Sequence, residues 1–146
     1  ASAGAVADAY RDLARRLGPE VVVQAMAPRG VEMALGMVSD PQFGPLLLIS
    51  AGGVLIELLR DRATALPPID EPRARRLLER LQVRPLLDEL RGASPVDTGP
   101  LVDAVLSLST LAIELGDHLS AVDINPLVVT DRGCLTVDAL VESPLD

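Results

Sequence analysis

The architecture is indicated by the stretch GVEMALGMVSDPQFGPLLLIS, residues 30–50. Two apolar runs, residues 31–39 and 46–50, flank the sequence DPQFG at 40–44, whose Asp, Pro and Gly are typical of a turn. The pattern predicts two extended segments joined by a hairpin connection.

Further apolar runs on either side extend this pair into a meander. Residues 20–26 contain three consecutive valines, a β-branched run typical of a buried strand. After Gly52 and Gly53, residues 54–59 form another apolar run. We therefore predict a meander of about four strands in this part of the chain.

Helical patterns lie before and after the meander. Residues 2–17 repeat apolar side chains at steps of three and four, and Gly18-Pro19 stops the pattern. A second helix is predicted over residues 70–81, with Asp70 as N-cap and a proline in the first turn.

Two more helices are expected further along the chain. Residues 85–90 predict a short helix that ends before Gly92. Thr98 is a predicted cap for a longer apolar helix, which Gly116 closes.

The final third, residues 121–140, predicts a hairpin whose two arms flank an Asp-Arg-Gly turn at 131–133. Strands, then helices, then a closing hairpin indicate an α+β fold, a mostly antiparallel sheet with helices packed on one face. The length of 146 residues predicts a single domain, 1–146.

Composition excludes several function classes. The net charge is −8 and aromatic residues make up 1% of the chain, which argues against nucleic acid as a partner. All 13 basic residues are Arg, so Schiff-base chemistry is excluded. The longest apolar stretch, 45–59, is shorter than the roughly 20 residues of a membrane helix. No leader pattern opens the chain. We expect a soluble, cytoplasmic protein that does not bind a membrane.

Single reactive side chains predict little chemistry. His118 lies just beyond Gly116 at a helix end, where a solvated histidine is expected, and Cys134 lies in an apolar strand as a small core residue. The arginines of residues 73–80 are expected to form a solvated helix face, paired with Glu71 and Glu79.

Two segments carry carboxylates in apolar surroundings. Glu32 lies at the start of a predicted strand, and Asp123 and Asn125 lie on the closing hairpin, with Asp138 on its other arm. The hairpin places Asn125 and Asp138 side by side on adjacent strands, and their oxygens suit Mg²⁺. The alternative is that Asn125 caps a bend before Pro126 and Asp138 faces solvent.

Taken together, five segments resemble the C-terminal part of the ATP-grasp domain of ADP-forming (NDP-forming) acetyl- and acyl-CoA synthetases. They are also similar to the β subunit of succinyl-CoA synthetase. The segments are VVVQAM at 21–26, GVEMALG at 30–36, DPQFGP at 40–45, GGV at 52–54 with Glu57, and VDINPL at 122–127 with Val137 and Asp138. The resemblance runs from about residue 19 to residue 140.

The resemblance implies a nucleotide site along residues 24–32. Gln24 matches a polar residue that reaches the nucleotide from the strand that links the two ATP-grasp subdomains. The backbone of Ala25, Met26 and Ala27 would read the adenine edge. Glu32 matches a glutamate that contacts the ribose hydroxyls.

The same resemblance implies the phosphate end of the site. Asn125 and Asp138 match ligands of the Mg²⁺ that presents the phosphates of ATP or ADP. Asp123 matches the carboxylate that faces the phosphohistidine of a mobile catalytic loop. Gly52 and Gly53 would let the backbone approach the phosphoryl group, and an ordinary bend is an equally good interpretation.

The chain also departs from the family pattern. It lacks the preceding subdomain with its lysine and glycine-rich lid, the catalytic-loop histidine, and the CoA-binding and ligase domains. The expectation is therefore half of an ATP-grasp domain from an acid–thiol ligase that forms acyl-CoA, inactive by itself and prone to weak self-association. Its expected partners are the nucleotide and those CoA-binding and ligase domains. The alternative is a regulatory synthetase-like domain of a protein acetyltransferase.

Overall fold

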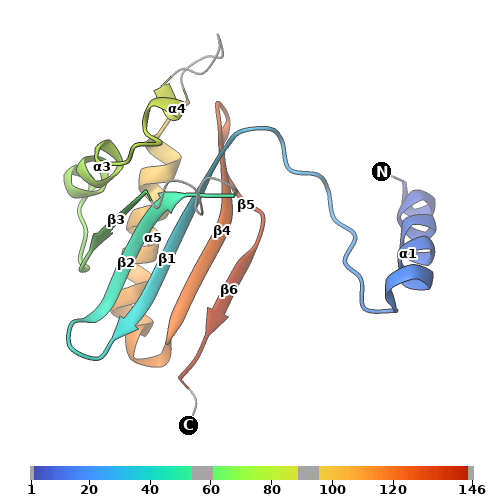
Figure 1. Ribbon diagram of the computed structural model, residues 1–146, viewed down its shortest axis with the longest axis horizontal. Helices are drawn as coiled ribbons and strands as arrows, with labels where there is room; N and C mark the ends of the chain where they lie inside the picture. The colour runs from blue at the N-terminus through green and yellow to red at the C-terminus, as the bar shows by residue number, and fades with distance from the viewer. Residues whose placement is uncertain (1, 54–60, 89–95, 145–146) are drawn as a thin grey trace.

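The computed structural model describes residues 2–53, 61–88 and 96–144. Its first element, α1 (Ala3–Leu17), begins where the sequence predicts: the Ser2 hydroxyl accepts a hydrogen bond from the Ala5 N–H at 3.2 Å, and Gly18 ends the helix. No residue of α1 is buried. Figure 1 shows α1 at the end of a long connection, away from the rest of the molecule.

The centre of the molecule is an antiparallel sheet of six strands. The strands are β1 (Val31–Asp40), β2 (Gly44–Ala51), β3 (Arg62–Ala65), β4 (Ala121–Thr130), β5 (Gly133–Thr136) and β6 (Ala139–Glu142). Their order is β3-β2-β1-β4-β5, and β6 also pairs with β4. The mostly antiparallel sheet that the sequence predicts is therefore confirmed.

The β1–β2 hairpin forms as predicted. The Asp40 carboxylate accepts hydrogen bonds from the N–H groups of Gln42 and Phe43, at 2.8 and 3.0 Å, and holds the turn. Gly44 follows with φ of 74°, which favours glycine. The pairing then runs from Asp40 with Gly44 to Met33 with Ala51.

The predicted meander differs from the structure in two places. One predicted strand, residues 20–26, does not form, and one observed strand, β3, was not predicted. Residues 20–26 are extended but belong to no strand, and Val22 is 82% exposed. A buried strand needs a neighbour on its edge, and no described strand lies beside this segment. Strand β3 was not predicted, because four residues with two small alanines give a weak signal. The predicted run 54–59 lies outside the described residues.

The helices are α3 (Glu71–Glu79), α4 (Pro85–Asp88), α5 (Gly99–Leu115) and the short 3-10 helix η1 (Gly116–His118). Helix α5 packs on one face of the sheet, against β1, β2 and β5, and α3 contacts α5 and β3 (Figure 1). Asp70 caps α3 as predicted, because its carboxylate accepts the Arg73 N–H at 2.8 Å. The Thr98 side chain does not cap α5, so that prediction is wrong; the Asp97 carboxylate accepts the Gly99 N–H instead. The other face of the sheet carries no described helix (Figure 1).

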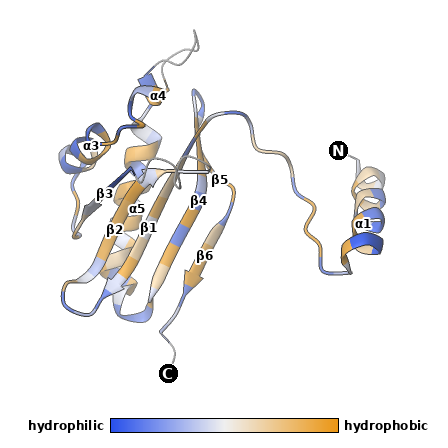
Figure 2. Ribbon diagram, in the orientation of Figure 1, coloured by the Kyte–Doolittle hydropathy of each residue, from blue (hydrophilic) through white to orange (hydrophobic). Residues whose placement is uncertain are grey.

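The core lies between α5 and the strands. Met33, Leu35 and Met37 of β1 point to this side and are fully buried, and α5 buries Leu101 and Val105 against them. Figure 2 shows apolar residues concentrated in the central strands and in α5. Among the described residues, the segment Gly99–His118 is the one that is long and apolar enough to cross a membrane. Because one side of it packs against the sheet, it serves here as a core helix.

Candidate functional site

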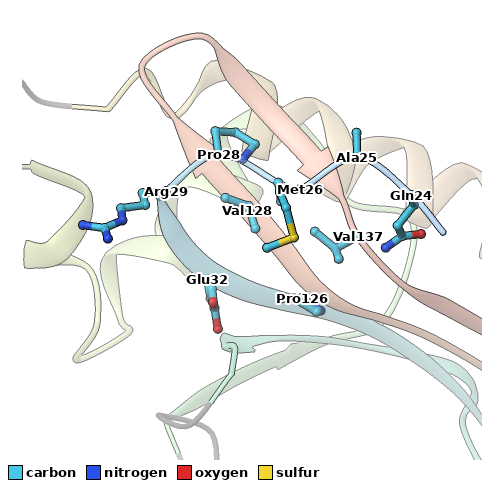
Figure 3. Close-up of a pocket in the computed structure, with 11 residues that line it drawn as sticks. Gln24, Ala25, Met26, Pro28, Arg29, Glu32, Pro126, Val128 and Val137 are labelled. Carbon is cyan, nitrogen blue, oxygen red and sulfur yellow. The ribbon is translucent and has the colours of Figure 1, made fainter. Parts of the chain in front are cut away.

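A groove lies between the connection that follows α1 and the open face of the sheet (Figure 3). It has a volume of about 520 Å³. One wall is the extended segment at residues 24–30, and the other is built by strand residues of β1 and β4 and by the segment after β5. The lining residues are Gln24, Ala25, Met26, Ala27, Pro28, Arg29, Gly30, Glu32, Pro126, Val128 and Val137.

Gln24, predicted to reach the nucleotide, and the three residues predicted to read the adenine edge, Ala25, Met26 and Ala27, all line this groove. In the part of the chain that the structure describes, the backbone groups of residues 24–27 make no hydrogen bond. The Met26 side chain is 94% exposed. An extended backbone with its N–H and C=O groups open to a groove suits the edge of a planar, polar ring. That these groups contact adenine stays a prediction.

Glu32 joins the groove to the glycine pair. The Glu32 carbonyl oxygen accepts the Gly52 N–H at 2.8 Å, so the end of β2 is tied to the start of β1. A Cβ built on Gly53 would lie 1.8 Å from the Glu32 carboxylate, and one on Gly52 would lie 2.6 Å from the Met33 carbonyl oxygen. Figure 3 shows the Glu32 side chain directed toward this end of β2.

The structure therefore gives the glycine pair a packing role. Gly53 has φ of 55°, a conformation that L side chains rarely adopt, and its missing side chain makes room for the Glu32 carboxylate. The approach of a phosphoryl group to the same backbone stays a prediction. The predicted continuation of this motif, Val54 and Glu57, lies outside the described residues.

Asn125 and Asp138 are neighbours across two strands. The Asn125 N–H donates to the Asp138 carbonyl oxygen at 3.2 Å, as the hairpin register requires. One residue further along, the Val137 N–H donates to the Pro126 carbonyl oxygen at 3.0 Å, and both of these residues line the groove. The predicted Mg²⁺ ligands thus lie directly beside the groove.

Strand β4 bulges at this point against β1. On β1, one residue lies between the paired positions Met33 and Leu35. On β4, two residues lie between their partners, namely Asn125 and Pro126. Such bulges redirect a side chain and are common next to active sites.

The pair fits Mg²⁺ by its chemistry. An amide and a carboxylate offer hard oxygen ligands, and Mg²⁺ in nucleotide sites is held by one or two protein groups, with phosphates and waters completing its shell. Within the described residues no arginine lies within ion-pair distance of Asp138, Asp123 or Glu32, and no cluster of three or more His, Cys, Asp or Glu occurs. Metal ligation by Asn125 and Asp138 stays a prediction.

Asp123 lies on β4 two residues before Asn125. It is exposed and pairs with Gly36 on β1 and with Leu140 on β6. Its neighbour Val122 is buried in the core, so alternation directs Asp123 to the face without helices. Asn125 follows two residues later, at the start of the bulge.

Two features of the groove were not singled out from the sequence. Arg29 extends from the end of the linking segment (Figure 3), and Val128 forms part of the floor. Arg29 directly precedes Gly30, the first residue of the GVEMALG segment. Its positive charge beside a predicted nucleotide site is the sequence signal by which it could have been found. Val128 carries no such signal, because in the sequence it looks like any other apolar residue of a strand.

Most of the remaining reactive side chains behave as expected, but Glu79 pairs with Arg84 at 3.1 Å rather than with an arginine of residues 73–80. Cys134 is half-buried, and burial raises the pKa of its thiol, with a further contribution from the negative charge of Asp97. It is therefore a thiol rather than a reactive thiolate. His118 is exposed in η1. Arg75 pairs with Glu71 at 2.8 Å, as its helical spacing predicts.

Comparison with known proteins assigns the chain to a family. A model described as an ATP-grasp domain matches residues 1–142. The beta subunit of an ADP-forming acetate–CoA ligase I of Pyrococcus furiosus is 34% identical over 119 residues, which are 82% of this chain and 51% of that subunit. An ADP-forming acetate–CoA ligase I of Archaeoglobus fulgidus is 35% identical over 81% of this chain and 17% of its own length.

A solved structure agrees with these relatives. The dinucleotide-forming acetyl-coenzyme A synthetase 1 of Ca. Korarchaeum cryptofilum was solved with coenzyme A and Mg-AMPPCP, its phosphohistidine segment pointing towards the nucleotide binding site. It superposes with a TM-score of 0.87 at 32% identity, over 98% of this chain and 65% of its own. The chain thus spans about half the length of the Pyrococcus subunit, and it belongs to the ATP-grasp domain family, among relatives that are ADP-forming acyl-CoA synthetases.

Proposed function

We propose that this chain is the C-terminal half of the nucleotide-binding ATP-grasp domain of an ADP-forming acyl-CoA synthetase, with acetyl-CoA or a similar short acyl-CoA as substrate. The parent reaction converts acyl-CoA, ADP and phosphate into the free acid, CoA and ATP. One observation carries the proposal. The groove beside the sheet is lined by the linking segment and Glu32, and it is bordered by Asn125 and Asp138.

In this proposal the groove holds the nucleoside. The open backbone groups of Ala25, Met26 and Ala27 bind the polar edge of adenine, and Gln24 contributes a side-chain amide. Glu32 accepts hydrogen bonds from the ribose hydroxyls. The glycine pair supports this role, because it lets the Glu32 carboxylate lie beside the end of β2.

Asn125 and Asp138 would hold Mg²⁺ beside the phosphates. When bound, the ion neutralises charge on the phosphates and fixes their geometry, which is most of what phosphoryl transfer requires. Both residues reach the site from backbone that is tied together by a hydrogen bond, so their relative position is set by the sheet.

Asp123 would orient the imidazole that carries the phosphoryl group. In the direction of ATP synthesis the N–P bond breaks, its electron pair stays on the imidazole nitrogen, and a terminal oxygen of ADP forms the new P–O bond. Asp123 accepts the N–H of the other ring nitrogen and holds the ring in the required tautomer. It acts on the ring through this hydrogen bond and takes no part in the new bonds.

The rest of the enzyme lies outside this chain. We propose that the other half of the ATP-grasp domain closes the groove, and that CoA-binding and ligase domains of the same polypeptide or of a partner subunit complete the site. The assembled enzyme is soluble and cytoplasmic, and this half is inactive when isolated. The packing of α5 against the sheet supports a soluble protein.

The proposal is tested by labelling the full-length protein that contains this chain. Incubation with Mg²⁺ and ATP labelled in the γ-phosphate should give a protein-bound phosphate that is lost in acid and kept in alkali, as expected for phosphohistidine. Asp123→Asn should slow this labelling about 100-fold, the scale of losing one group that stabilises charge.

Asp131→Asn is the matched control, because Asp131 is also exposed but lies in the β4–β5 turn. It should label like the wild type. Absence of labelling in the wild-type protein despite Mg–ATP binding would contradict the enzymatic proposal and support the regulatory alternative.

A further inference from the structure

Gly36 lies in the middle of β1, although the fold itself gives no reason for a glycine there. It is not among the glycines with positive φ. A Cβ at this position would lie 3.4 Å from the Val122 carbonyl oxygen and 3.8 Å from the Leu48 Cβ, which are ordinary contacts. Glycine weakens the interior of a strand, and it often marks a place where a ligand or another backbone comes close.

The position of Gly36 in the sheet shows where that approach would occur. Its neighbours Leu35 and Met37 are fully buried on the helix side, so alternation places Gly36 on the face without helices (Figure 1). It pairs with Leu48 on β2 and with Asp123 on β4. The β1 backbone is therefore bare between an apolar side chain and a carboxylate.

Among the described residues of this face, those beyond Gly36 toward the β1–β2 turn and toward β6 are exposed, whereas Ala34, two residues before Gly36, is 5% exposed. On the same face, Val38 is 40% exposed and Leu140, the β6 partner of Asp123, is 58% exposed. Among the described residues, no arginine pairs with Asp123. A group that lies on Gly36 would thus meet apolar side chains and one carboxylate without a cationic partner.

We infer that Gly36 is a positioning residue for the histidine-bearing segment of the parent enzyme. The segment lies against the bare β1 backbone, so that its imidazole reaches Asp123 edge-on and donates an N–H to the carboxylate. A side chain at position 36 would lift the ring away from Asp123. This inference rests on the proposed function, because it assumes that Asp123 orients a phosphorylated imidazole.

The test uses Gly36→Ala and Gly36→Val in the full-length protein, with the same phosphohistidine labelling. We expect labelling to slow at least tenfold in Gly36→Ala and more in Gly36→Val. The affinity for Mg–ADP should stay within twofold, because Gly36 is not among the residues that line the groove. The thermal midpoint should be unchanged or higher, since both substitutions raise β-propensity.

Val38→Ile is the matched control, because it adds one methylene group on the same face, two residues along β1 and away from Asp123. It should label like the wild type. Wild-type labelling in both Gly36 variants, while Asp123→Asn has lost it, would overturn the inference and leave the proposed function intact.

Two other results have equally distinct meanings. Slow labelling in Gly36→Ala together with a lower thermal midpoint or weaker Mg–ADP binding would show a structural role and would overturn the inference. Wild-type labelling in Asp123→Asn would remove the proposed role of Asp123, and the inference would fall with it.

Discussion

The two walls of the groove come from regions that differ in how they are held. Residues 2–30 contain α1, which buries no residue, and an extended segment in which Val22 and Met26 are 82% and 94% exposed. The sheet and its helices, by contrast, bury Met33, Leu35 and Met37 completely. Both regions contain strongly apolar sequence.

The difference shows that an apolar segment forms a strand only where a neighbouring strand pairs with its backbone. Strand β1 has hydrogen-bonded neighbours on both edges and α5 on one face. The valines of residues 21–23 have no described neighbouring strand. Since an exposed apolar segment is stabilised by whatever covers it, the linking segment offers a surface that the proposed other half of the domain would cover.

The largest expected difference between the two regions is in how much a truncated side chain lowers the free energy of unfolding. Leu35→Ala removes a fully buried side chain and should lower the free energy of unfolding by about 2–5 kcal/mol. Val22→Ala removes an exposed one and should change it by less than about 0.5 kcal/mol. Urea unfolding of both variants measures the difference. Equal losses would mean that the linking segment is packed in solution.

The next prediction is a substitution that lowers activity and leaves stability almost unchanged. Asp138→Ala in the full-length enzyme should reduce turnover at least about 100-fold, because Mg²⁺ and the transferring phosphate lose a charged ligand. The unfolding midpoint should hardly change, since Asp138 is exposed. Steady-state kinetics over a range of Mg²⁺ concentrations measures this. Activity within threefold of the wild type would reject the metal role.

Two glycines with positive φ, one in each region, allow the same substitution to be compared directly. Gly53→Ala and Gly18→Ala both place a side chain at positive φ, at a cost of about 1–3 kcal/mol each. A Cβ at Gly18 meets nothing within 4 Å, whereas one at Gly53 overlaps the Glu32 carboxylate. Only Gly53→Ala should therefore weaken Mg–ADP binding by the full-length enzyme, by about tenfold, on the scale of one hydrogen bond to a charged group.

Titration calorimetry of the two glycine variants, with the wild type beside them, measures that difference. Equal affinities for Gly53→Ala and the wild type would show that the Glu32 position does not matter for the nucleotide.

The smallest signal should come from the isolated chain. It should bind Mg–ATP with a Kd of about 1 mM or weaker, because it supplies one side of the groove. The net charge of −8 also opposes an anion, and the chain has no lysine to meet the phosphates. Calorimetry with ATP and Mg²⁺ checks this, and sedimentation checks the expected weak self-association. A micromolar site would show that this chain is sufficient for binding and would contradict the proposal that it is half of the domain.

The sequence correctly predicted the turns and helix starts that depend on hydrogen bonds between residues only a few positions apart. The β1–β2 turn follows from Asp40, whose carboxylate accepts two backbone N–H groups within three residues. The start of α3 follows from Asp70 in the same way. The register of the closing hairpin follows from its Asp-Gly turn, and this turn is enough to predict that Asn125 and Asp138 lie side by side.

The sequence alone determined the sheet type, the hairpins and most of the helices of this protein, because turns, caps and periodicity act over a few residues. The tertiary structure alone decided which apolar runs became strands and which face of the sheet stayed open. It also decided that Gly53 makes room for Glu32 and that β4 bulges at Asn125. These features depend on contacts between segments far apart in the chain, and no local pattern encodes the partner that completes them.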